Sequence, residues 1–301
     1  MVWAPVRDPD SGLMGFINED GEYMIYPQYY YVESFASNGL AVICDGTDYR
    51  NSLKGYIDVW GNSVIEPKYL NASAFDENGF AAVQESGSEL WGFIDSSGYY
   101  VIEPQFSFAT AFTATGLALV EDPQSGLCGY IDMSGNYVIA PKFAWAHEFA
   151  ANGLASVEDQ EDGLYGFIDT TGNYVIAPQF PMAFNFASNG LAAVEDANKW
   201  LYGYIDKSGA YVIAPQFDWA DDFSTNGLAV VSVSNSNLCG FIDSAGNYVI
   251  APQFLGAWIF GDSGLAPVQD PGSGLYGYID QTGKYVISPQ YSGAGDFNLM
   301  D

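Results

Sequence analysis

The hydrophobic positions of the chain follow one pattern that recurs along its length. One copy runs from Gly166 to Asp196 and reads GFIDTTGNYVIAPQFPMAFNFASNGLAAVED. The segment Gly-(Phe/Tyr)-Ile-(Asp/Asn)-x-x-Gly opens each copy, and the spacing is 40 residues once and then 37 residues six times. The opening glycines are Gly15, Gly55, Gly92, Gly129, Gly166, Gly203, Gly240 and Gly277. Constant spacing of this kind indicates one supersecondary unit stacked many times.

Within one copy, the residue pattern predicts strands joined by tight turns. Residues 203–206, 211–213 and 227–231 are rich in the aromatic and β-branched residues that strands favour. Asp206 and Gly209 bracket the first turn. Because aspartate caps backbone N–H groups and glycine accepts a positive φ, they predict a type I turn with a glycine bulge.

The segment that follows Pro215 and its equivalents has two interpretations. Proline cannot donate a backbone hydrogen bond, so we expect the ladder of the strand to end there. An aromatic residue, an alanine and a phenylalanine then follow at intervals of three, as in Phe180, Ala183 and Phe186. This spacing favours a helical turn, because a flat strand would place the alanine on the opposite face. A short fourth strand with a bulge is the other interpretation, and the sequence leaves both open.

The chain begins in the middle of a copy. Residues 3–9 match residues 265–271, and the last copy reaches Phe297, just before the Leu-Ala-x-Val strand would recur. We therefore predict an all-β single domain over residues 1–301, built of eight antiparallel β-meander repeats. Its two ends would complete one unit and close a propeller-like ring, which leaves no exposed sheet edges at the ends. An open β-repeat superhelix is the alternative.

These repeats resemble those of the WG-repeat proteins of bacteria, also called KWG-repeat proteins. Their pattern is roughly Leu-Ala-x-Val, then Trp-Gly-Tyr-Ile-Asp, then x-x-Gly and an apolar triplet ending in proline. Residues 91–95 carry its centre as Trp-Gly-Phe-Ile-Asp, and the resemblance covers nearly the whole chain. Elsewhere the tryptophan position holds Met14, Lys54, Cys128, Tyr165, Tyr202, Cys239 and Tyr276. The resemblance implies a repeat or interaction module without an assigned reaction.

Charge narrows the choice of partner. The 301 residues include 8 Lys+Arg against 37 Asp+Glu, which gives a formal net charge of −29. Proteins that bind nucleic acid or anionic membranes need clustered basic residues, so both partners are disfavoured and a basic or neutral protein is favoured. No apolar run approaches the ~20 residues of a membrane-spanning helix, and the first residues show no signal-peptide pattern. These observations leave the compartment undetermined.

The repeated aspartates have a structural explanation. The residue that opens the turn recurs as Asp58, Asp95, Asp132, Asp169, Asp206, Asp243 and Asp280, with Asn18 in the first copy. Asparagine caps a turn as well as aspartate does but carries no charge. A calcium loop would also need further oxygen ligands at fixed offsets. The pattern therefore favours turn capping over a ring of calcium ligands.

The cysteines and the only histidine indicate no catalytic or metal site. Cys128 and Cys239 hold equivalent positions three repeats apart and cannot meet, and Cys44 lies on a different strand, so we predict three free thiols. The sequence contains no Gly-x-Ser-x-Gly motif whose serine His147 could activate, so we expect His147 at the surface or the rim. We expect no catalytic residue, no metal, no cofactor and no enzymatic activity.

Two positions of the repeat vary from copy to copy. The first holds Tyr31, Asn71, Phe108, Trp145, Met182, Trp219, Gly256 or Gly293, and the second holds Glu33, Ser73, Thr110, His147, Phe184, Asp221, Trp258 or Gly295. Varied residues on a constant scaffold are typical of a binding face in repeat proteins. The candidate binding residues are the large aromatic ones: Tyr31, Phe108, Trp145, Phe184, Trp219 and Trp258. The alternative is that these rings fill the spaces between units.

The sequence therefore favours a non-catalytic scaffold that binds another protein. A lectin-like module with aromatic pockets for carbohydrate is the second hypothesis. A hydrolase with an Asp/Glu pair in a central channel is a distant third, because carboxylates are abundant but no pair is singled out.

Overall fold

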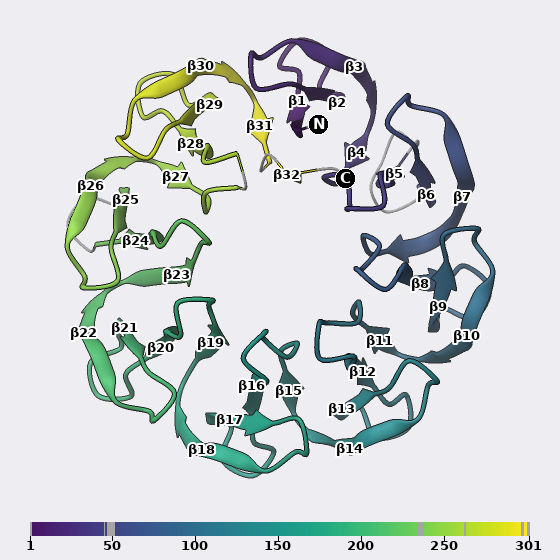
Figure 1. Cartoon of the computed structure of the whole chain (residues 1–301), viewed down its shortest axis with the longest axis vertical. Helices are drawn as coiled ribbons and strands as arrows, with labels where there is room; N and C mark the ends of the chain where they lie inside the picture. The colour runs from purple at the N-terminus through teal and green to yellow at the C-terminus, as the bar shows by residue number, and fades with distance from the viewer. Residues whose placement is uncertain are drawn as a thin grey trace. The chain divides into compact units, whose positions relative to one another are not determined.

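The computed structural model describes residues 2–44, 46, 52–233, 238–261, 263–295 and 298–299. Throughout these ranges the regular structure consists of β-strands, which confirms the all-β prediction (Figure 1). None of the described segments forms a helix that could cross a membrane.

The strands belong to two compact units, which comprise residues 1–111 with 260–301 (unit 1) and residues 112–259 (unit 2). The strands of unit 1 are β1 (Val2–Arg7), β2 (Met14–Ile17), β3 (Tyr23–Tyr29), β4 (Tyr31–Val32), β5 (Ala41–Cys44), β6 (Lys54–Ile57), β7 (Ser63–Ala72), β8 (Phe80–Glu85), β9 (Trp91–Asp95), β10 (Tyr100–Phe106), β11 (Phe108–Ala109), β28 (Ala266–Gln269), β29 (Tyr276–Ile279), β30 (Tyr285–Tyr291), β31 (Gly293–Ala294) and β32 (Asn298–Leu299). The strands of unit 2 are β12 (Ala118–Glu121), β13 (Cys128–Ile131), β14 (Tyr137–Phe143), β15 (Trp145–Ala146), β16 (Leu154–Glu158), β17 (Tyr165–Asp169), β18 (Tyr174–Phe180), β19 (Ala183–Phe186), β20 (Ala192–Glu195), β21 (Tyr202–Ile205), β22 (Tyr211–Phe217), β23 (Trp219–Phe223), β24 (Ala229–Ser232), β25 (Cys239–Ile242), β26 (Tyr248–Phe254) and β27 (Gly256–Ala257).

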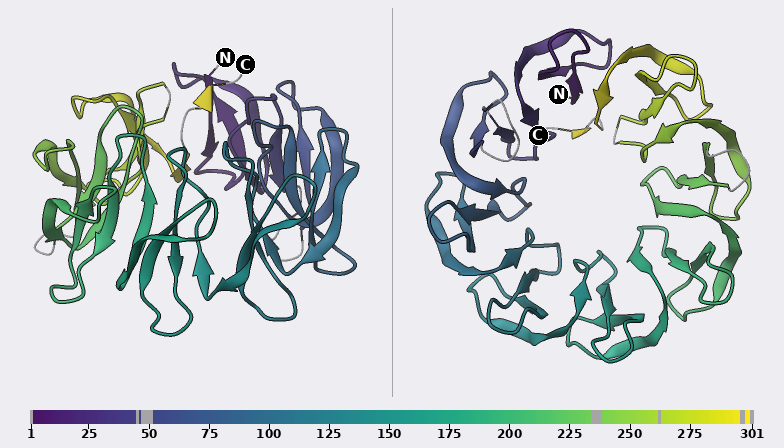
Figure 2. Two further views of the ribbon diagram at one scale, coloured as in Figure 1. Left: turned by 60° about the horizontal axis from the view of Figure 1, so that its bottom comes forward. Right: turned by 180° about the vertical axis from the view of Figure 1, so that it is seen from behind.

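Each repeat is an antiparallel meander of four strands, and the first strand has only two residues in five of them, namely β4, β11, β15, β27 and β31. In unit 2 the order is β15-β16-β17-β18, then β19-β20-β21-β22, then β23-β24-β25-β26 (Figures 1 and 2). In unit 1, β7 is long enough to be the fourth strand of one repeat and the first strand of the next, which joins two repeats in one sheet. The eight copies predicted from the sequence are therefore eight meanders.

The core lies between neighbouring sheets of a unit. Strands β20 and β21 bury side chains on both faces, because each sheet has a neighbouring sheet to pack on. One core cluster joins Ala193 and Tyr204 of one sheet to Phe223 and Val231 of the next. This packing explains why the Leu-Ala-x-Val and Gly-Tyr-Ile segments are almost continuously apolar.

The aspartate turn has the predicted structure. The N–H of Gly209 donates to the carbonyl of Asp206 at 2.9 Å, and Gly209 has a φ of +84°. The Oδ1 atom of Asp206 accepts hydrogen bonds from the backbone N–H groups of Ser208 (2.8 Å) and Ala210 (3.2 Å). The repeated aspartates therefore cap turns, as the sequence indicated, and Asn18 makes the equivalent bonds in the first copy.

The prediction that the strand ends at its proline is wrong. Strand β22 runs through Pro215 to Phe217. Between the pairs Tyr204–Ile213 and Tyr202–Phe217, four steps along β22 match two steps along β21. Because of the bulge, the ladder does not require a hydrogen bond from the nitrogen of Pro215, which carries no hydrogen. The bulge also brings the β22 backbone close to Gly203. A Cβ atom at Gly203 would lie 2.6 Å from the Ile213 oxygen, so only glycine fits there.

The segment with two interpretations is a short strand with a bulge, not a helical turn. In β19, Ala183 pairs with Val194 and Phe186 pairs with Ala192, so three steps along β19 match two steps along β20. The extra residue places the alanine and the phenylalanine on one face, where both are buried. A spacing of three can thus arise in a bulged strand as well as in a helix.

The two ends of the chain complete one meander inside unit 1, as predicted. Strand β1 lies between β2 and β31, with Val6 opposite both Gly15 and Ala294. Residues Val2 and Trp3 also pair with β32. Phe297, the last residue of the repeat pattern, lies outside the described residues. Closure of all eight repeats into a ring, and the single domain over residues 1–301, stay predictions.

Candidate binding surface

The six candidate aromatic residues lie on the first strand of their meanders or directly after it. Trp145, Trp219 and Trp258 leave 46%, 46% and 42% of their surface exposed. The other three, Tyr31, Phe108 and Phe184, are partly buried. These exposed fractions are large for tryptophan, which is usually well buried.

Unit 2 gathers two of the candidates into an aromatic cluster. The rings of Phe184 and Trp219 are 5.3 Å apart between centroids and meet edge to face. Tyr202 contacts both of them, at 6.2 Å from Phe184 and 5.4 Å from Trp219. His147 lies 6.2 Å from Phe184 and 6.5 Å from Tyr165, which extends the cluster into the preceding sheet. His147 is therefore partly buried among aromatic rings, and burial lowers its pKa.

Sequence reasoning missed Tyr165, Tyr202 and His147 as members of this cluster. Tyr202 precedes Trp219 by 17 residues and stands at the family's tryptophan position in the preceding repeat. The same interval joins Trp91 to Phe108, whose ring centroids are 5.7 Å apart. It also joins Lys54 to Asn71, where the Nζ atom donates a 3.0 Å hydrogen bond to Oδ1. A search for residues that vary together at this interval would have found the pairs.

Carboxylates adjoin the aromatic rings of unit 2. Glu158 pairs with Trp145 across β15 and β16, and its Oε2 accepts a 3.2 Å hydrogen bond from the hydroxyl of Tyr165. Glu195 pairs with Tyr202 across β20 and β21. Burial raises the pKa of both tyrosines, and the nearby glutamate charges raise it further. These hydroxyls therefore stay protonated at neutral pH.

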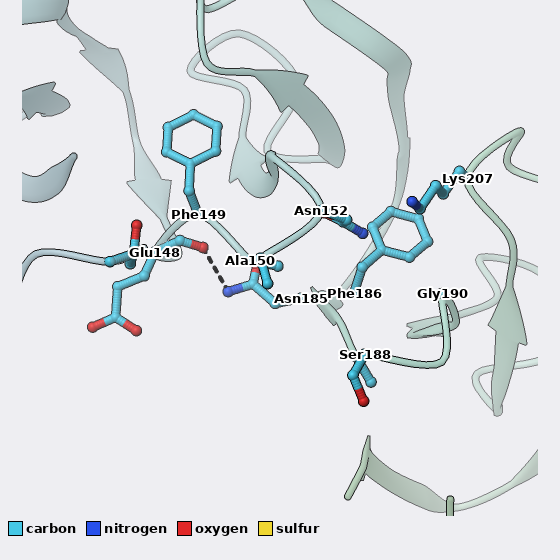
Figure 3. A pocket seen from close by; sticks show the side chains of 12 residues that line it. Glu148, Phe149, Ala150, Asn152, Asn185, Phe186, Ser188, Gly190 and Lys207 are labelled. Atoms are coloured by element: carbon cyan, nitrogen blue, oxygen red, sulfur yellow. Dashed lines mark hydrogen bonds between the residues drawn. The ribbon is translucent and has the colours of Figure 1, made fainter. Parts of the chain in front are cut away.

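A cavity of about 510 Å³ lies in unit 2, and the residues that follow His147 and Phe184 in the sequence help to line it (Figure 3). Glu148, Asn152, Ser188 and Lys207 are among its lining residues. Asn185 joins two sheets at its wall: Nδ2 donates to the Glu148 carbonyl at 2.7 Å, and Oδ1 accepts from the Ser156 N–H at 3.2 Å. Asparagine stands here in one repeat only, so the repeat pattern gave no signal for the cavity.

A second cavity, of about 370 Å³, lies in unit 1. Tyr31, Glu33, Arg7 and the glycines Gly293 and Gly295 help to line it. The Arg7 guanidinium donates to the Tyr30 carbonyl at 3.1 Å and lies over the Tyr30 ring. The two chain ends complete one repeat, and both variable positions of that repeat are glycine (Gly293 and Gly295). The cavity adjoins these two glycines.

The described residues offer little for nucleophilic or metal chemistry. No group of three or more His, Cys, Asp or Glu side chains is placed to hold a metal ion within the described ranges. The thiols of Cys44, Cys128 and Cys239 are free. Burial raises the pKa of Cys128 to about 11, which keeps it a thiol at neutral pH.

The comparisons with known proteins agree with the repeat fold. The model of the WG containing repeat family matches residues 14–46, 55–87, 91–122, 129–162, 165–200, 202–235, 240–270 and 276–298. None of the curated protein sequences matches the chain.

Three similar solved structures share the fold at low sequence identity. The dihydro-heme d1 dehydrogenase NirN, in complex with DHE, has a TM-score of 0.65 at 12% identity, over 98% of this chain and 74% of that one. Apo AztD from Citrobacter koseri has a TM-score of 0.53 at 11% identity, over 99% and 96%. Hsv2 of Kluyveromyces lactis has a TM-score of 0.53 at 11% identity, over 88% and 98%. At this identity the likeness concerns the fold alone. Because eight matches of the family model cover most of the chain, the protein belongs to the WG containing repeat family.

Proposed function

We propose that this protein is a non-catalytic scaffold that binds another protein through the variable aromatic residues of its first strands. The observation that carries the proposal is the half-exposed state of Trp145 and Trp219 at one fixed position of a repeated frame. Tryptophan is enriched among the residues that dominate binding energy, and a ring already held by its neighbours loses little entropy on binding.

The repeat itself supports a binding role over a catalytic one. Its recurring polar residue, the aspartate or asparagine that opens the turn, accepts hydrogen bonds from backbone N–H groups. His147 lies against the rings of Tyr165 and Phe184, and the hydroxyl of Tyr165 donates to Glu158. At the variable position that Trp145 and Trp219 share, both rings are 46% exposed, and recognition is a role that such variation serves.

The test is capture of binding partners by the immobilised protein from a lysate of its native organism, compared with the double variant Trp145→Ala, Trp219→Ala. We expect the wild type to capture a specific protein that the double variant does not capture. The matched control is Trp60→Ala, Trp200→Ala, which removes two tryptophans that are 80% and 67% exposed but lie in turns. It should retain the partner.

The same three proteins, the wild type and the two double variants, are then applied to a glycan array, which separates this proposal from the lectin hypothesis. We expect no glycan to bind. A glycan that binds the wild type and is lost with Trp145→Ala, Trp219→Ala would replace the protein scaffold by a lectin. A protein partner that is retained by both double variants would refute the role of the first strands.

A further inference from the structure

We propose that the aromatic surface of unit 2 is a site for cationic side chains, and that its ligand is an extended protein segment bearing arginine or lysine. We define this surface by Trp145, Glu158, Phe184, Glu195 and Trp219, with Tyr165 and Tyr202 beneath. The inference rests on the proposed function and names the chemistry of its partner.

The tryptophan rings of this surface are exposed but partly held in place. Trp219 is 46% exposed, yet its ring contacts Phe184 at 5.3 Å and Tyr202 at 5.4 Å. Part of the ring is thus held by packing while the rest is open to solvent. Among aromatic side chains, the face of tryptophan attracts a guanidinium or an ammonium group most strongly. A ring fixed by neighbours is already in place for such a contact.

Two glutamate carboxylates adjoin the aromatic side chains of this surface. Glu158 lies directly opposite Trp145 in an antiparallel pair, and residues so placed have Cβ atoms about 4.5–5.5 Å apart. The hydroxyl of Tyr165 donates to Glu158 and fixes the carboxylate. Glu195 lies opposite Tyr202, which contacts Trp219. Trp145 therefore lies across from a carboxylate, and Tyr202 connects Trp219 to a second one. The combination of an aromatic face and a negative charge suits a cation better than a neutral sugar or an apolar side chain.

The acidic and aromatic residues of this surface recur from repeat to repeat. Glutamate recurs at one register in three successive repeats, as Glu121, Glu158 and Glu195, each partly exposed at the end of its second strand. The exposed tryptophans recur two repeats apart. A ligand that uses more than one of these positions must extend over several sheets, as an extended peptide segment does. The net charge of −29 increases the rate at which a basic segment arrives.

The experiment uses the full chain and a synthetic peptide of arginine and glycine residues. The comparison peptide has citrulline in place of each arginine, which keeps the planar shape and removes the charge. Binding is measured by calorimetry at about 0.15 M salt, where exposed charges more than about 8 Å apart are largely screened. We expect the arginine peptide to bind at least about tenfold more tightly than the citrulline peptide, since a charge pair and a cation–π contact are lost together.

Two variants locate the site. Trp219→Ala, and separately Glu158→Gln with Glu195→Gln, should each weaken the arginine peptide about tenfold, as hot-spot truncations do. The charge control is Glu19→Gln with Glu77→Gln, which removes two exposed carboxylates from unit 1. The aromatic control is Trp60→Ala. Both controls should leave the dissociation constant within about twofold, because neither touches a binding contact.

Each outcome decides the proposal. If the Glu158/Glu195 and Glu19/Glu77 variants weaken binding of the arginine peptide equally, the peptide is attracted to the overall charge only, and the proposed site is overturned. Equal binding of the arginine and citrulline peptides would also overturn it. The glutamine variants keep the size of the side chain, so they remain informative if Trp219→Ala does not fold. A captured partner that needs Trp145 and Trp219 but not Glu158 and Glu195 would leave the proposed scaffold standing while this inference fails.

Discussion

Asp222 is a buried carboxyl group whose protonation is linked to folding. Its Oδ1 atom is buried without a hydrogen-bond partner, and burial together with the charge of Asp221 raises its pKa to about 7. The residue 37 positions earlier is Asn185, whose amide bonds to the carbonyl of Glu148 and the N–H of Ser156 in the neighbouring sheet. An ionised Asp222 cannot donate as that amide does. The folded state therefore favours the protonated acid.

The substitution Asp222→Asn should stabilise the protein in a pH-dependent way. The folded-state pKa is above the unfolded one, so the stability linked to protonation is present near pH 4 and is lost as the pH rises through about 7. We expect the variant to gain roughly 2–4 kcal/mol over the wild type at pH 8 and little at pH 4. Urea unfolding at both pH values measures this. A gain that does not change with pH would contradict the assignment.

The glycine of the repeat motif is required by a close approach of two backbones. Gly203→Ala would place a Cβ 2.6 Å from the Ile213 oxygen and 2.8 Å from the Pro215 nitrogen. Because both atoms belong to the backbone, the bulge of β22 would have to shift, at a cost of about 2 kcal/mol or more. The control Gly190→Ala has open space around the new methyl group but a φ of +83°, so it tests backbone strain alone. Thermal melting should rank Gly203→Ala as the more damaging; the opposite order would refute the close-approach explanation.

At the scale of the elements, the third strands alternate between two kinds of contact. The residue after the motif glycine is Phe16, Tyr56, Phe93, Tyr130, Phe167, Tyr204, Phe241 and Tyr278 in chain order. Each tyrosine hydroxyl donates to the backbone carbonyl of the second variable position, 17 residues later in the next repeat. The acceptors are Ser73, His147, Asp221 and Gly295, at 2.6–2.9 Å. Every second step from repeat to repeat therefore has a hydrogen bond that ties the variable strand to the core.

Removal of one such hydroxyl should lower the free energy of unfolding, because the donor is buried. Tyr204→Phe removes the bond to the Asp221 carbonyl, and we expect a loss of about 1–3 kcal/mol of unfolding free energy. The control Tyr211→Phe removes a bond to Asp196 from a side chain that is 39% exposed and should cost less than about 1 kcal/mol. Chemical denaturation compares the two. Equal losses would mean that the buried bond contributes no more than the exposed one.

At the scale of the whole molecule, β1 is the strand on which the meeting of the two chain ends depends. It forms the interior of a sheet between β2 and β31, and Ala4 and Val6 on it are fully buried. Deletion of residues 1–7 removes ladder hydrogen bonds and buried apolar surface, so a loss of several kcal/mol is expected. The control deletes residues 298–301, which removes the short pairing of β32 with β1 and leaves β1 between β2 and β31. Thermal melting of the two truncated proteins checks this, and an unchanged melting temperature after the first deletion would favour an open array over a closed ring.

The sequence by itself determined the repeat unit, its number and its turns. The fixed interval, the aspartate and glycine of the turn, and the apolar runs of the second and third strands are local signals, and each follows from backbone sterics or from burial on both faces. The family could be identified for the same reason. The candidate residues Trp145 and Trp219 were also found from the sequence, because a position that accepts both glycine and tryptophan is poorly suited to a packed core.

The tertiary structure decided what depends on contacts between strands. The alanine–phenylalanine spacing was compatible with a helix until the register of β19 and β20 showed a bulge. The strand proline is tolerated because a second bulge moves it out of the ladder, which no single segment reveals. Contacts between different strands or neighbouring repeats also create the aromatic cluster and place the glutamates beside it. Such contacts bury Asp222 as well. A spacing rule read along one strand cannot report such neighbours, because their distance is set by how the sheets pack.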